Sequence, residues 1–146
     1  MIARRIIVLL LLLGALAEAW PAAQTLVLVV RRDSPVTDLD SVTVRKLFLG
    51  VPVLINGTPL RPIRNRSEPH LDEIFLQQIV AMSQPSYDRQ ILNGVNRQGW
   101  LAPSEAASVT RVAAELNANP NAVSFMWERD VAHNPNLRVL RVLWSD

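Results

Sequence analysis

Four consecutive residues, Arg64, Asn65, Arg66 and Ser67, form the most suggestive group of polar side chains in the sequence. They stand where an expected strand runs directly into an expected helix. A helix N-terminus offers free N–H groups and partial positive charge to an anion, and guanidinium and hydroxyl groups add charge-assisted hydrogen bonds. We therefore expect a small-oxyanion site, for example for phosphate, made by Arg66 and Ser67 with Arg64 and His70 as neighbours.

The same segment also has a purely structural interpretation. In that case Ser67 only caps the following helix, while Arg64 and Arg66 are solvated. Three acidic side chains in the first turns oppose an anion site: Glu68, Asp72 and Glu73.

Other kinds of reactive or metal-binding site find little support. The chain has no Cys, which excludes disulfides, thiolate metal ligands and a thiol nucleophile. His70 and His133 are too far apart for a metal-ligand spacing, and nucleotide-binding and hydrolase motifs are missing. Asp38 and Asp40 are typical of turns and helix caps. We therefore expect no enzyme, no metal site and no cofactor.

Length and charge narrow the function classes further. The 146 residues suffice for one domain of ordinary size. A formal charge of +2 argues against a nucleic-acid partner, although 14 of the 15 basic residues are Arg. Guanidinium groups suit planar anions, so this excess of Arg agrees with an anion site without requiring one.

Residues 1–23 have the pattern of a secretory signal peptide. A basic start precedes an uncharged apolar run at residues 6–17, which is shorter than the about 20 residues that span a bilayer. Small residues suit cleavage near residue 19 or residue 23. We expect a periplasmic domain of residues 24–146 that does not insert into the membrane after cleavage; an uncleaved anchor is the alternative.

The sequence of the first half of this domain predicts two strands and a short helix. A continuous apolar run at residues 25–30 is typical of a strand buried on both faces. A short helix should follow a cap at Ser41 and end at Gly50. Residues 60–64 can form a strand after an Asn-Gly turn, and Pro62 makes that strand an edge or an irregular one.

Three further helices and two strands are expected in the second half. The strongest helix should follow Ser67 as its cap, the next should begin at Ser83 and stop near Gly94, and the third should span residues 104–116. The strands are expected at residues 122–126 and 137–143. Because strands and helices alternate, we expect an α/β domain with a mostly parallel or mixed sheet covered by helices.

Several segments, in order along the chain, resemble a known family of type 2 periplasmic solute-binding domains. The segments are Val44-Arg45-Lys46-Leu47-Phe48-Leu49-Gly50, Asn56-Gly57-Thr58-Pro59-Leu60, Pro62-Ile63, Arg66-Ser67, Ala81-Met82-Ser83 and Asn119-Pro120-Asn121-Ala122-Val123-Ser124-Phe125-Met126. This family is similar to the phosphate-binding subunit of ABC importers. Full members close two lobes around a ligand, so the resemblance implies a single-lobe short form of the fold.

The resemblance implies an exported solute-binding module of the phosphate ABC transporter type, with a membrane permease as a partner. Asp72 stands where many small relatives keep an Arg, and the Ser-Gly-Thr helix start of the phosphate binders is replaced by Glu68-Pro69-His70-Leu71. These departures favour an alternative, which is a ligand-free interaction or sensory module that contacts a sensor kinase or a transport component.

Overall fold

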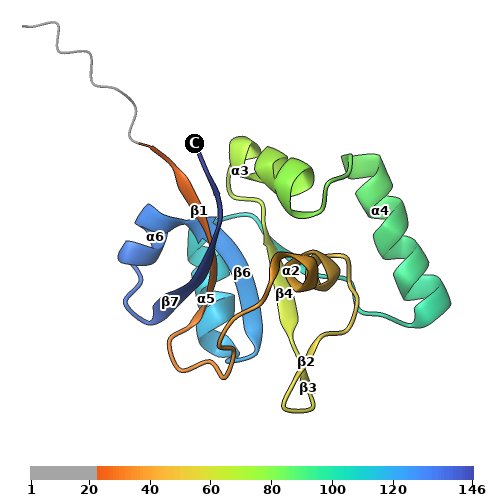
Figure 1. Ribbon diagram of the computed structural model, residues 1–146, viewed down its shortest axis with the longest axis horizontal. Coiled ribbons are helices and arrows are strands. Elements are labelled where there is room, and N and C mark those ends of the chain that lie inside the picture. The colour runs from red at the N-terminus through yellow and green to blue at the C-terminus, as the bar shows by residue number, and fades with distance from the viewer. Residues whose placement is uncertain (1–22) are drawn as a thin grey trace, which may run out of the picture.

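The computed structural model describes residues 23–146, and Figure 1 shows how their elements are arranged. The strands are β1 (Thr25–Arg31), β2 (Leu54–Ile55), β3 (Thr58–Pro59), β4 (Arg61–Asn65), β5 (Ser104–Ala106), β6 (Ala122–Trp127) and β7 (Leu137–Ser145). The helices are α2 (Ser41–Phe48), α3 (Pro69–Ile74), α4 (Gln84–Asn93), α5 (Val109–Ala118) and α6 (Glu128–Ala132), with π-helical turns η1 (Phe75–Ile79) and η2 (Gly94–Gln98). The expected signal peptide lies outside the described residues except at Ala23. No helix within residues 23–146 combines the length and the apolar character that crossing a bilayer requires.

A five-stranded mixed sheet forms the centre of the domain, in the order β5-β4-β6-β1-β7. Strand β4 runs parallel to β5 and β6, whereas β1 is antiparallel to β6 and β7. Strands β2 and β3 form a separate hairpin, in which Asn56 and Gly57 have φ values of 51° and 79°. This left-handed conformation is what a tight two-residue turn needs. The predicted mixed α/β class and the Asn-Gly turn are confirmed.

Helices cover both faces of the sheet, so two separate apolar cores form. On one face α2, α3 and η1 form a core with Leu26, Leu28 and Val30 of β1, to which α4 adds Tyr87. On the other face Val29 of β1 belongs to a smaller core, to which α5 and α6 contribute. Because successive strand residues point to opposite faces, a strand between two helical layers is apolar throughout. The predicted burial of the first strand on both faces is confirmed.

Helix α3 begins later than the sequence predicts, and Ser67 is not its cap. The N-cap is Glu68, which makes no side-chain capping bond, and Pro69 is the first helical residue. The Asn65 side-chain oxygen instead accepts the Ser67 N–H at 3.0 Å, which forms a turn before the helix. Because Pro69 has no N–H to satisfy, the helix can begin there without a side-chain cap.

Two other helix starts also differ from the predictions. The N-cap of α2 is Asp40 instead of Ser41, because the Asp40 carboxylate accepts the Thr43 N–H at 2.7 Å. The third predicted helix begins only at Val109, after the cap residue Ser108. The three residues expected as its first turn form strand β5, because they pair in parallel register with the end of β4.

Strand β4 is not at the edge of the sheet, which corrects the edge alternative drawn from Pro62. It lies between β5 and β6. Pro62 is tolerated because it pairs only with Val123 of β6, while the ladder to β5 begins opposite Ile63. The missing N–H of the proline therefore interrupts no bond between β4 and β5.

Helix α4 ends at Asn93 with Gly94 as its C-cap, as predicted, and the chain then continues directly through the π-helical turn η2. This helical turn ends at Gly99, whose φ of 67° is left-handed. Tyr87 is buried against the first core as predicted, but Leu92 is exposed. Figure 1 shows α4 standing away from the sheet, which explains why only part of its predicted apolar side is covered.

The first and last strands are neighbours, and they bring the two ends of the described chain together. The Gln24 N–H donates to the Asp146 carboxylate at 2.6 Å, and the Asp146 N–H donates to the Gln24 carbonyl at 3.2 Å. Figure 1 shows the C-terminus beside the start of β1.

Candidate functional site

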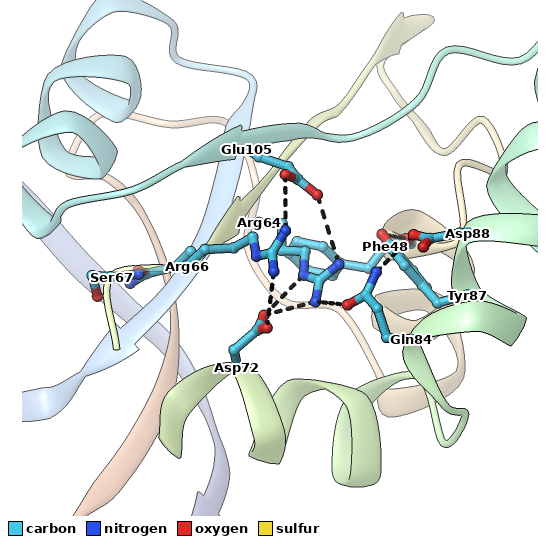
Figure 2. A network of polar contacts seen from close by, with 10 residues as sticks. Phe48, Arg64, Arg66, Ser67, Asp72, Gln84, Tyr87, Asp88 and Glu105 are labelled. Atoms are coloured by element: carbon cyan, nitrogen blue, oxygen red, sulfur yellow. Dashed lines mark hydrogen bonds and ion pairs between the residues drawn. The ribbon is translucent and has the colours of Figure 1, made fainter. Parts of the chain in front are cut away.

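The candidate site lies at the carboxyl end of β4, where alternate side chains take different directions. Arg64 and Arg66 are two residues apart and meet the same carboxylates (Figure 2). Asn65 between them is buried, and its side-chain amide donates to the Phe125 carbonyl of β6 at 2.9 Å. The strand therefore presents two guanidinium groups on one side and anchors itself to the sheet with the residue between them.

Arg64 is almost completely buried, with 1% of its side chain exposed. Its guanidinium donates to the Asp72 carboxylate at 2.7 and 3.1 Å and to the Gln84 side chain at 2.7 Å. The same group lies over the rings of Phe75 and Tyr87, at 4.7 and 4.9 Å from their centroids. Burying a charge is costly unless it is paired, so these contacts are what keep Arg64 in the core.

Asp72 and Glu105 connect the two guanidinium groups. Arg66, which is 41% exposed, lies 3.5 Å from the second Asp72 carboxylate oxygen and 3.3 Å from Glu105. Glu105 also approaches Arg64 at 3.7 Å. Figure 2 shows the two carboxylates on opposite sides of the guanidinium pair. Two positive and two negative charges make this cluster neutral.

Two buried polar atoms at the site have no hydrogen-bond partner among the described residues. They are the Arg64 Nη1 atom and the Ser67 hydroxyl oxygen. Arg64 Nη1 has Glu105 at ion-pair distance only, and Ser67 is freed from capping because Glu68 takes the cap position. Buried polar atoms are usually satisfied, so these two are the features of the cluster that point to a missing partner.

His70 belongs to a different environment from the guanidinium pair. Its ring stacks on Trp127 with centroids 6.0 Å apart and meets the edge of Trp144 at 6.1 Å. Among residues 23–146, the one carboxylate at ion-pair distance from the His70 ring is that of Glu73, at 4.0 Å. The structure thus brings together Arg64 and Arg66, leaves Ser67 beside them, and turns His70 toward the tryptophans.

Three residues of the cluster were not predicted from the sequence as site residues: Asp72, Gln84 and Glu105. The sequence indicates Asp72 only as a negative charge in the first turns of a helix, and its distance to Arg64 depends on where α3 begins. Glu105 was assigned to a helix, which hid its position on β5 next to β4. The only sign in the sequence that carboxylates neutralise the two guanidinium groups is Asp72, which stands where many small members of the resembling family keep an Arg.

The chemistry available at this site is recognition of charge. Burial raises the pKa of the Tyr87 phenol, which donates to the Phe48 carbonyl at 2.7 Å. Tyr87 therefore stays uncharged, and its ring packs against the Arg64 guanidinium. Within residues 23–146, no group of three or more His, Asp or Glu side chains is arranged to hold a metal ion.

Comparison with known proteins shows which solved structures have a similar fold. No protein-family model matches the sequence, and no curated protein matches it. Among solved structures, similar folds include an ABC-type phosphate transport receptor from Vibrio cholerae, with a TM-score of 0.52 and 16% identity over 82% of this chain and 46% of that one. PstS from Borrelia burgdorferi has a TM-score of 0.55 and 12% identity, over 81% of this chain and 47% of that one. A possible phosphate binding protein from Planctomyces limnophilus has a TM-score of 0.58 and 8% identity, over 82% of this chain and 41% of that one.

These similarities confirm the predicted fold and its resemblance to phosphate ABC transporter substrate-binding proteins. The chain spans less than half of the length of each of these three structures, in keeping with the predicted single-lobe form. Their names describe a transport receptor and binding proteins, not enzymes. The domain is therefore similar in fold to part of a periplasmic binding protein of the phosphate type.

Proposed function

We propose that the protein is an exported, periplasmic module of one binding-protein lobe that works by contact with another protein, such as a sensor kinase or a membrane transport component. The observation that supports this proposal is the position of the Asp72 carboxylate between Arg64 and Arg66. A carboxylate of the chain itself takes the hydrogen bonds that a captured oxyanion would need.

The charge balance of the cluster supports the same proposal. Two like charges 4 Å apart repel by about 4 kcal/mol at an effective dielectric constant of 20. A hydrogen bond to a charged group contributes only about 1.5–3 kcal/mol. An oxyanion that approached Arg66 would meet both Asp72 and Glu105, so repulsion would cancel much of what the remaining donors contribute.

A phosphate titration of wild type and Asp72→Asn tests the proposal directly. Asparagine keeps an oxygen that can accept from Arg64 but removes the negative charge. We expect no saturable shifts in the ¹H–¹⁵N NMR spectrum of the wild type at millimolar phosphate, and saturable shifts around Arg66 and Ser67 in the variant. Sulfate should give the same result, because the site recognises the negative charge of the anion and does not require the proton that phosphate can donate.

A second candidate function is reversible oxyanion binding by the wild type, as in the resembling family. The unpartnered Arg64 Nη1 and Ser67 hydroxyl favour it, because both lie in the cluster and lack a hydrogen-bond acceptor or donor. In this case the wild type itself would show saturable shifts with phosphate, and Arg66→Ala would abolish them. That result would replace the first proposal with the second.

The partner is tested by a pull-down from periplasmic extract with and without phosphate. We expect one retained protein whose recovery does not depend on phosphate. Recovery that rises with phosphate would instead support a ligand-dependent contact, as a transport receptor would make. Glu105→Gln provides a further variant that removes one charge from the cluster at an exposed position, in case Asp72→Asn does not fold.

A further inference from the structure

A groove of about 310 Å³ lies at the opposite end of β4 from the guanidinium cluster. Three segments line it: the end of α2 with the loop that follows, the residues where β3 leads into β4, and the connection before β5. Pockets that bind small molecules have volumes from about 300 Å³ upward, so the groove is at the lower limit of that range. Arg61 and Asn65 are four steps of about 3.3 Å apart, so the two ends of β4 are separated by about 13 Å.

Two glycines hold the outer wall of the groove in place. A Cβ atom at Gly94 would lie 2.7 Å from the Trp100 ring, so this ring packs directly on the glycine. A Cβ atom at Gly50 would lie 3.4 Å from the Leu101 carbonyl oxygen, and Gly50 has a φ of 88°. The wall is therefore built on close backbone contacts that larger residues would disturb.

The lining of the groove is apolar and poor in hydrogen-bond donors. Buried Leu47 and Leu60 belong to the first core and contribute side chains to the lining. Three prolines, Pro52, Pro59 and Pro62, contribute no backbone N–H. Leu101 at the rim is 73% exposed and extends the apolar lining to the surface.

Arg61 is the one ionisable side chain among the residues that line the groove. It is exposed, and its side chain makes no hydrogen bond or ion pair with any residue from 23 to 146. The lining residue Ser104 donates to the Glu115 carboxylate, which is already paired with Arg111 at 3.1 Å. Arg61 thus differs from Arg64 and Arg66, which the chain itself neutralises.

An apolar groove with one uncompensated guanidinium matches a ligand with an apolar body and one negative charge. We infer that the groove binds a small monocarboxylate with an aromatic or branched aliphatic body. The carboxylate pairs with Arg61, and the body lies between Trp100 and Leu60. A guanidinium binds a carboxylate with two parallel hydrogen bonds, which fixes the orientation of the ligand.

The test uses 4-phenylbutanoate as the probe and 4-phenylbutan-1-ol as a matched neutral compound. We expect saturable ¹H–¹⁵N shifts at Gly50, Gly99 and Leu101 with the acid, and binding at least about tenfold weaker for the alcohol. Arg61→Gln should weaken the acid by about the same factor and leave the alcohol unchanged. Butanoate, which keeps the charge without the ring, should bind more weakly than the phenyl compound.

Arg89→Gln is the matched control, because Arg89 is exposed on α4 and does not line the groove. This variant should bind the acid as the wild type does. Equal binding of acid and alcohol, or an Arg61→Gln variant that binds the acid normally, would overturn the inference, as would the absence of saturable binding. The acid and alcohol comparison on the wild type stands even if the variant fails to fold, and its outcome is independent of the phosphate titration.

Discussion

The Arg64 guanidinium and the Asp72 carboxylate approach to 2.7 Å, and only 1% and 18% of the two side chains are exposed. Removing one member of a buried ion pair leaves an uncompensated charge, which costs about 3–5 kcal/mol. We therefore expect Asp72→Ala to lower the free energy of unfolding by about that amount, as measured by urea denaturation.

The matched control for this variant is Arg66→Gln. Its guanidinium is more exposed, so its ion pairs should contribute no more than about 1 kcal/mol. The double variant Arg64→Met with Asp72→Leu should recover most of the lost stability, because replacing both charges leaves none buried. A cost below about 1 kcal/mol for Asp72→Ala would mean that Gln84 and Glu105 alone suffice for Arg64.

The Tyr87 phenol should stay protonated well above its ordinary range. Burial raises its pKa, so the folded state holds the proton where the unfolded state releases it. This contribution to stability is complete below pH about 10 and is lost as the pH rises further. Because Tyr87 is the one tyrosine of the chain, the rise in absorbance at 295 nm that accompanies phenol ionisation reports Tyr87, above a constant tryptophan background. A simple titration near pH 10 without unfolding would contradict the prediction.

Tyr87→Phe separates the hydroxyl from the ring. The variant keeps the ring against Arg64 and loses the 2.7 Å bond to the Phe48 carbonyl. A buried acceptor left without a donor costs about 1–3 kcal/mol, so we expect a destabilisation in that range at pH 7. The alkaline loss of stability should disappear in this variant, which provides the control for the titration.

Gly94→Ala should test the wall of the apolar groove. Alanine normally favours a helical position over glycine by about 1 kcal/mol. Here its Cβ would lie 2.7 Å from the Trp100 ring, so we expect the substitution to destabilise the protein and to shift the tryptophan fluorescence, with no such shift when Trp100 is absent. In a Trp100→Ala background the same substitution should become stabilising. Stabilisation of the wild type would show that the ring moves aside freely.

Asp130 should give a pH dependence of opposite sign to that of an ordinary ion-paired carboxylate. Burial raises its pKa, so the folded state binds the proton more tightly than the unfolded state. Its contribution to stability is therefore lost as the pH rises from 3.8 through the raised value. Asp130→Asn should flatten the change in unfolding free energy between pH 4 and pH 7, as measured by urea denaturation.

Asp33→Asn is the control for the sign of this effect. The hydrogen bond from Arg31 lowers the pKa of Asp33, so its contribution is present at neutral pH and is lost as the pH falls below 3.8. The two variants should therefore change the acid side of the stability profile in opposite directions. Parallel changes would contradict the assignment of Asp130.

The central strand β1 was predictable from the sequence because its apolar content fixes how it is covered. Residues 26–30 are apolar throughout, and the structure packs them between two helical layers. The Asn56-Gly57 turn was predictable because few other residue pairs adopt its backbone. Helix starts were less predictable, because the Ser67 N–H donates to the Asn65 side chain in a turn before the helix and α3 begins only at Pro69.

The site was predictable only in part, for a related reason. Arg64 and Arg66 could be placed together because they alternate along one strand. Glu105 could not, because a three-residue strand beside β4 carries almost no periodic signal and exists only through its pairing. His70 lies in the first turn of the helix as expected, but its direction is set by Trp127 and Trp144, which are far away in the sequence.

The hydrogen bonds between Gln24 and Asp146 close the fold into a near-continuous ring. A short flexible linker from residue 146 to residue 24 would add little strain, and the exposed turn at Asn56 and Gly57 offers a place to open the chain. Circular permutation there should therefore preserve both cores. It would also allow the domain to be inserted into a surface loop of a carrier protein, with its candidate binding surfaces intact.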